Sequence, residues 1–142
     1  MAYADQDDIE KKCTQDVLVQ LTDLEASASV NTSVLAEAIE VADREIDSYI
    51  RVRGVTVPMT TVPSIITQLS VALAIAELYI NRGSLPEAVK DRRDWARNWL
   101  KDYAVGKVSM GDEDQASADP ALGAVNSTAG ARIYTRTLMA QW

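Results

Sequence analysis

The side chains that most often carry out chemistry in proteins are scarce in this sequence. Its 142 residues include no histidine and a single cysteine, Cys13. The chain therefore cannot build a Ser-His or Cys-His catalytic pair, a histidine-ligated metal site, an internal disulfide or a zinc site made of cysteines. We predict that Cys13 is a small, buried, apolar residue.

The motifs of the sequence also point away from catalysis. It contains no phosphate-binding loop, dinucleotide-binding fingerprint, nucleophile elbow or HExxH motif. The run DQDD at residues 5–8 resembles the start of a calcium-binding loop, but the glycine and closing glutamate of such a loop do not follow at the required spacing. We expect no catalytic residue, no cofactor and no bound metal. A hydrolase built on paired carboxylates is the contrasting hypothesis.

Composition and charge are typical of one soluble domain that does not bind nucleic acid. Hydrophobic residues make up 47% of the chain and charged residues 25%, with a net charge of −7. A nucleic-acid-binding protein needs clustered Lys and Arg to neutralise phosphates. The most apolar run, residues 71–80, is about half the length that spans a bilayer. Because residues 1–8 are acidic and do not resemble a signal peptide, we expect a cytoplasmic protein without a membrane partner.

Apolar residues spaced three and four apart predict an all-α fold, a compact bundle of about four main helices. Residues 3–21 read as one or two short helices, with Asp5 as an N-cap and Thr14 as a second cap. Asn31 is predicted to cap a long helix that runs to about Arg53 and is ended by Gly54.

The next predicted helix, residues 64–81, follows a proline and is apolar on nearly every side from Leu69 onward. This pattern is typical of a helix at the centre of a bundle, covered by its neighbours. Glu77 is the exception, and we expect it at the margin of the bundle or paired with an arginine such as Arg82 or Arg44.

The last predicted helix begins near Ser84, which has capping-box spacing to Glu87. Its predicted buried residues are Val89, Ala96, Trp99, Leu100 and Tyr103. Arg92 and Trp95 form an exposed ridge on this helix, within a basic patch that includes Arg93 and Arg97. One hypothesis is that the ridge binds a partner, because Trp and Arg are favoured interface anchors. The simpler interpretation is a solvated helix face on which an arginine rests on the indole.

Three segments lack the helical pattern. Residues 54–63 contain two prolines and predict an extended connection, and residues 107–110 are a candidate short strand between glycines. Residues 112–131 are acidic and rich in Ala and Ser, which predicts a flexible linker.

Residues 132–142 form an extended C-terminal tail, a strand-prone docking segment in which large apolar side chains return after the linker. The candidate partner-binding residues of the segment are Arg132, Ile133, Tyr134, Arg136, Leu138, Met139 and Trp142. The segment could add a strand to a neighbouring sheet edge or fold back on its own bundle. About 19 flexible residues have a span on the order of 25 Å, which permits both, and we favour the intermolecular alternative.

The chain carries, in this order, the runs MAYADQDDIEKKCTQDVLVQLTD, DREIDSYIRVRGVTVPMTTVPSIITQLSVALAIAELYINRG and WARNWLKDYAVGKVSMG, and then ARIYTRTLMAQW. In these runs it resembles the Mu-like phage and prophage family of small head-tail connector (adaptor, head-completion) proteins. The most specific part is the succession of a helix end, a Pro-containing connection and a buried helix. These landmarks are structural rather than catalytic.

The resemblance implies an all-α adaptor without enzymatic activity, with residues 1–111 as the helical connector domain. Copies would form a ring, expected to be a dodecamer, below the portal protein of a tailed phage. The ring would extend the DNA channel and dock the tail-completion or tail-terminator protein, in the neck of the virion after assembly in the host cytoplasm. An acidic ring would repel passing DNA rather than bind it. The alternative function is a non-virion, soluble helical module that binds a host or phage protein as a regulator.

Overall fold

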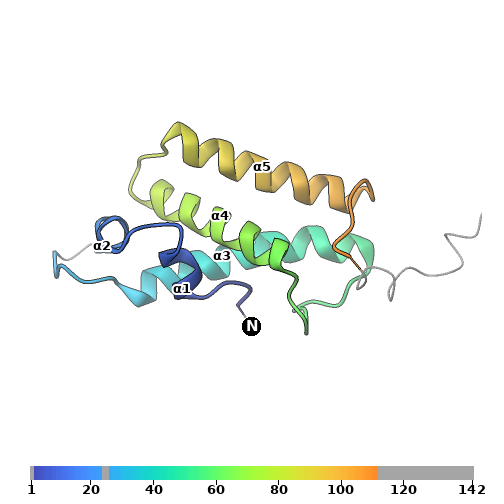
Figure 1. The fold of residues 1–142 in the computed structure, drawn as a ribbon, viewed down its shortest axis with the longest axis horizontal. Helices are drawn as coiled ribbons and strands as arrows, with labels where there is room; N and C mark the ends of the chain where they lie inside the picture. The colour runs from blue at the N-terminus through green and yellow to red at the C-terminus, as the bar shows by residue number, and fades with distance from the viewer. Residues whose placement is uncertain (1, 24–25, 112–142) are drawn as a thin grey trace, which may run out of the picture.

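A computed structural model describes residues 2–23 and 26–111 of the chain. Over these residues the fold is all-α, as predicted, with three long helices, two short ones and no strand. The long helices are α3 (Thr32–Ile50), α4 (Ser64–Asn81) and α5 (Glu87–Ala104). Figure 1 shows α4 between α3 and α5, with the short helices α1 (Gln6–Glu10) and α2 (Gln15–Thr22) against one side of this stack.

The first helices begin where the sequence predicts. Asp5 and Thr14 are the N-caps of α1 and α2. The side chain of Asn31 caps α3 by accepting hydrogen bonds from the two N–H groups of residues 33 and 34, at 3.1 and 3.3 Å. The α-helix ends at Ile50, earlier than predicted, because the chain tightens into the 3₁₀ turn η1 (Arg51–Arg53). Gly54 follows with φ of 74°, a left-handed conformation that glycine adopts without steric cost.

Helix α4 has the predicted bounds and forms the centre of the core. Pro63 is its N-cap, and nine of its residues are buried. Helices α1, α2, α3 and α5 all contact it. Helix α4 is also long enough, and with a mean hydropathy of 1.4 apolar enough, to cross a bilayer. Core helices of soluble proteins meet the same two criteria. Half of the helix is buried within the bundle.

The predicted capping box at the start of α5 is wrong. The helix begins at Glu87 with Pro86 as its N-cap, whereas a box on Ser84 needs Leu85 in a helical conformation. A residue that precedes proline is disfavoured in that conformation by steric clash with the ring. The N–H of Ser84 instead donates to the carbonyl of Tyr79 at 3.1 Å, at the C-terminal end of α4.

The predicted strand at residues 107–110 is also wrong. This segment follows α5 as an irregular turn. The carbonyl of Val108 accepts a hydrogen bond from Nη1 of Arg53 at 3.3 Å. Val108 and Met110 pack against the core, so the apolar residues that suggested a strand cover the end of the bundle. Residues 54–63 form the predicted non-helical connection, which includes a cis Val57–Pro58 bond and the buried Met59.

Candidate binding surfaces

The Arg92 and Trp95 ridge of α5 has the geometry of a solvated helix face on which an arginine rests on the indole. The guanidinium carbon of Arg92 lies 5.1 Å from the ring centroid of Trp95, and Trp95 is 40% exposed. This cation–π contact covers one face of the indole and leaves the rest of the side chain at the surface. Binding of a partner by this ridge stays a prediction.

Arg97 does not belong to that ridge. Its Nε and Nη2 donate to the two carboxylate oxygens of Glu45 on α3, at 2.6 and 3.1 Å. A bidentate pair of this kind fixes orientation as well as distance. It joins α3 to α5 along the seam between them. The hydrogen bond to Glu45 raises the pKa of Arg97.

Arg97 is instead part of a row of four basic side chains along one flank of α5. Their spacing of three, four and four residues places them on one side of the helix. We call them the α5 basic stripe: Lys90, Arg93, Arg97 and Lys101. Nε of Arg93 is buried without a hydrogen-bond partner, and the nearest carboxylate oxygen, Oδ1 of Asp94, lies 3.6 Å away.

An open apolar groove of about 550 Å³ lies between α4 and α5, beside the turn between α1 and α2. Val71, Ile75 and Tyr79 contribute to its apolar wall, and Arg92 lies at its α5 side. Cys13 also lines it and is buried, as predicted. Burial raises the pKa of the Cys13 thiol, so the reactive thiolate is disfavoured.

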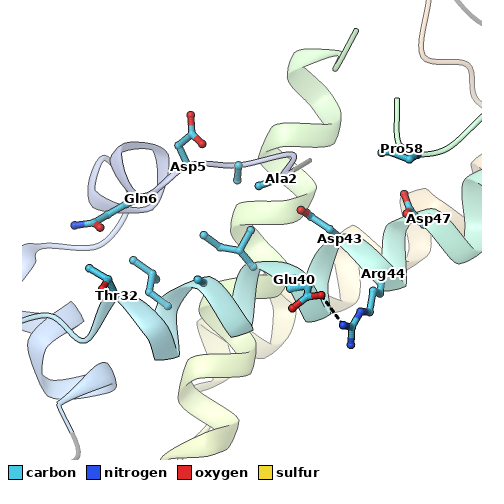
Figure 2. A pocket seen from close by; sticks show the side chains of 13 residues that line it. Ala2, Asp5, Gln6, Thr32, Glu40, Asp43, Arg44, Asp47 and Pro58 are labelled. Carbon is cyan, nitrogen blue, oxygen red and sulfur yellow. Dashed lines mark hydrogen bonds and ion pairs between the residues drawn. The ribbon is translucent and has the colours of Figure 1, made fainter. Parts of the chain in front are cut away.

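A second groove, also of about 550 Å³, lies between the N-terminal segment, α1 and α3. We call it the α3 acidic groove, because its lining includes the four carboxylates of Asp5, Glu40, Asp43 and Asp47 and one basic side chain, Arg44. Figure 2 shows Asp43 and Asp47 on the side of α3 that faces the N-terminal segment and Pro58, while Glu40 and Arg44 form an ion pair at the outer edge.

The carboxylate of Asp43 is the centre of a buried hydrogen-bond network that the sequence reasoning missed. Its Oδ2 accepts from the N–H of Tyr3 at 2.9 Å, and its Oδ1 accepts from the hydroxyl of Ser70 at 2.7 Å. The Tyr3 hydroxyl donates to Asp47 and also accepts from the N–H of Met59 at 3.3 Å. One signal was available, since Asp43 lies four residues after Ile39 and three before Ile46, in the apolar register of α3.

Burial also raises the pKa of two groups in this network. Desolvation raises the pKa of Asp43, although the hydrogen bonds from Ser70 and Tyr3 oppose it. Burial and the hydrogen bond to Asp47 raise the pKa of Tyr3 to about 12. The network joins the N-terminal segment to α3, α4 and the 54–63 connection, and this gives it a structural role.

The other sequence-predicted residues fall in three places. Glu77 lies half-buried at the margin of the bundle, in a hollow that Arg82 also lines, so the first of its two predicted positions is confirmed. Over residues 2–23 and 26–111 no cluster of three or more His, Cys, Asp or Glu side chains could hold a metal ion. The linker at 112–131 and all seven tail residues, from Arg132 to Trp142, lie outside the described residues.

Comparison with known proteins gives one consistent result. A model of the family described as "Bacteriophage Mu, Gp36" matches residues 3–129. The chain is also 32% identical over 129 residues to the Mu-like prophage FluMu protein gp36 of Haemophilus influenzae. That alignment covers 90% of this chain and 89% of the relative. Residues 3–129, which the family model matches, include every helix described above. The chain therefore belongs to the bacteriophage Mu Gp36 family, a family of phage and prophage proteins.

Proposed function

We propose that this protein is a structural component of the virion, a head-tail connector. In this proposal its copies form a ring below the portal, extend the DNA channel and present a docking surface to the tail. The observation that carries the proposal is the family match along nearly the whole chain. It agrees with the resemblance of the same residues to small connector proteins.

The surfaces of the molecule support a role in assembly. The two large grooves are open and are lined by side chains from two or more helices, as a surface that receives another protein would be. The acidic groove and the apolar groove differ in chemistry, so they suit different neighbours. The central α4 contacts all four other α-helices, and a surface built on packed helices is more precise than one built on loops.

We propose further that the protein acts by assembly alone, without a catalytic step. The sequence has no histidine, and the buried thiol of Cys13 is held in its unreactive form. The buried carboxylate of Asp43 already accepts hydrogen bonds from Tyr3 and Ser70. A net charge of −7 favours a channel wall from which the DNA backbone is repelled.

Electron microscopy of purified virions tests the proposal. We expect a ring of this chain at the neck, between the portal and the tail. Deletion of the gene should give DNA-filled heads and free tails that do not join, and expression of the full chain from a plasmid should restore joining. If the chain is absent from virions, the connector function is wrong. The alternative, a non-virion module that grips another protein through the Arg92–Trp95 ridge, would then be favoured.

A further inference from the structure

Charge is distributed unequally between two parts of the bundle. The described residues up to 50, which form α1, α2 and α3, include eleven acidic and three basic side chains. Residues 51–111, which form η1, α4 and α5, include five acidic and nine basic ones. Formal charge is thus negative on one part of the molecule and positive on the other. Such a molecule is electrostatically complementary to a second copy placed head to tail.

The α5 basic stripe is the clearest positive surface. Lys90 and Lys101 are exposed, and neither forms an ion pair within the described residues. The contact between Arg93 and the neighbouring Asp94, at 3.6 Å, is too long for a hydrogen bond. Only Arg97 is fully engaged, through Glu45.

The α3 acidic groove is the matching negative surface. Two of its four carboxylates, Asp43 and Asp47, accept hydrogen bonds from Tyr3. The carboxylate of Glu40 pairs with Arg44, and these two side chains are 63% and 70% exposed. Exposed pairs of this kind contribute little stability, so Glu40 can exchange its partner at low cost. The groove follows α3 from Thr32 to Asp47, about 22 Å, whereas the stripe is about 16 Å long. Measured along the helix axes, the stripe is therefore no longer than the groove.

The two surfaces cannot meet within one copy. The stripe meets α3 at Glu45, through Arg97. Glu45 is two positions from both Asp43 and Asp47, which is about 200° around the helix. The groove therefore opens on the far flank of α3 from the stripe. An interface between two different surfaces of the same chain is heterologous. Such interfaces generate a closed ring when the rotation between copies closes, and a helical filament when it does not.

We propose that the α5 basic stripe of one copy docks in the α3 acidic groove of the next, and that this contact is the interface between ring subunits. The inference rests on the proposed function and assigns the two faces through which copies meet. It also predicts the direction of the ring, because every copy offers its stripe to one neighbour and its groove to the other.

Two charge-reversed variants of the full chain test the interface. In the stripe variant, Lys90→Glu and Lys101→Glu replace the two exposed lysines of the stripe with carboxylates, so that its exposed ends are acidic like the groove. In the groove variant, Ala36→Lys and Glu40→Lys place two lysines beside Arg44, so that the α3 edge of the groove is basic like the stripe. Both positions line the groove and are exposed. Neither variant touches the buried network. Each is supplied to a phage that lacks the gene, alone or as an equal mixture, and the amount of the chain on purified heads is measured relative to the portal.

We expect the amount of each variant on heads, when it is supplied alone, to be lower than that of wild type by roughly tenfold or more. The reason is that like charges then face each other across the interface. The mixture should recover most of the wild-type amount, since each copy again meets an oppositely charged neighbour. Recovery on mixing would not occur if these faces bound the portal. Single reversals at Arg51→Glu, an exposed residue of η1 that lines neither groove, and Glu37→Lys, on another face of α3, are matched controls and should leave the amount unchanged.

Cross-linking of the wild-type chain on heads gives an independent measurement that does not depend on how the variants fold. A carbodiimide joins a lysine to a carboxylate in direct contact, and we expect products between Lys90 or Lys101 and Glu40. Because stripe and groove lie on different flanks of one copy, these products must join two copies.

Three results would overturn the interface: variants that each assemble like wild type, a mixture that does not recover, or cross-links that avoid Glu40. In all three the wild-type chain is still on the heads, so the connector function stands. Absence of the wild-type chain from heads would instead overturn the proposed function and the interface together.

Discussion

Asp43 provides a direct test of how the bundle is held together. Substitution by alanine removes the acceptor of two buried hydrogen bonds, from the Tyr3 N–H at 2.9 Å and the Ser70 hydroxyl at 2.7 Å. A buried donor left without a partner costs about 1–3 kcal/mol. The Ser70 hydroxyl can rotate towards a carbonyl of its own helix, so its cost is at the low end. We expect Asp43→Ala to lower the free energy of unfolding by about 2–4 kcal/mol at pH 7.

Asp43→Asn separates the hydrogen bonds from the charge. The asparagine oxygen can accept from the Tyr3 N–H while its amide donates to Oγ of Ser70. Both bonds are then kept and the burial of a charge is avoided. We therefore expect Asp43→Asn to change the free energy of unfolding by less than about 1 kcal/mol at pH 7. Urea denaturation followed by circular dichroism measures both variants against wild type.

The pH dependence of the free energy of unfolding tests whether the pKa of Asp43 is raised in the folded protein. Burial raises the pKa of Asp43, so the folded protein takes up this proton at a higher pH than the unfolded chain does. Wild type should gain stability relative to Asp43→Asn as the pH falls through that raised pKa. The gain is complete once the unfolded carboxylate is protonated as well, at about pH 4 and below. If wild type loses stability relative to Asp43→Asn on acidification, or if the asparagine costs as much as the alanine, the reasoning is refuted.

Three further predictions concern other parts of the chain. A double-mutant cycle with Glu45→Gln and Arg97→Met should give a coupling of about 0.5–1.5 kcal/mol, since the pair is bidentate but partly exposed; a coupling near zero in urea titrations would contradict its role at the seam. Because the pKa of Tyr3 is raised to about 12, its contribution to stability should be complete below about pH 10 and be lost as the pH rises towards 12. Alkaline unfolding curves of wild type and Tyr3→Phe should therefore converge over that window, and parallel curves would contradict the shift. Truncation after Gly130 should leave a helical, cooperatively melting protein that no longer attaches stably to a portal or a neighbouring copy, whereas loss of the melting transition itself would show that the tail belongs to the core.

Local signals in the sequence were sufficient for most of the helices. The bounds of α4 followed from Pro63 and from a continuous apolar run, and Asn31 marked the start of α3. The start of α5 differs from the prediction because Pro86 disfavours a helical conformation at Leu85, a restriction that the spacing of Ser84 and Glu87 does not contain. The spacing of two residues indicates that a capping box is possible. Whether the box forms depends on the backbone conformation that the residues between them can adopt.

The surfaces were harder to predict because they depend on contacts between distant residues. The sequence places Arg97 in one basic patch with Arg92, because both lie on the same helix. In the structure Arg97 instead pairs with Glu45, which lies fifty-two residues earlier in the chain. The network of Asp43 joins residues from the N-terminal segment, α3 and α4. A sequence pattern shows which residues share a helix face, whereas only the packed structure shows which faces meet.

The contacts of Tyr3 also have a consequence for the order in which the protein folds during synthesis. Its hydroxyl meets the N–H of Met59, fifty-six residues later in the chain. At a translation rate of about 5–20 residues per second, the ribosome needs roughly 3–11 s to make that partner after Tyr3. Meanwhile α1 and α2, with five and eight residues, are too short to persist alone. We therefore expect the residues that are made first to settle last, against a frame that α3 and α4 have already built.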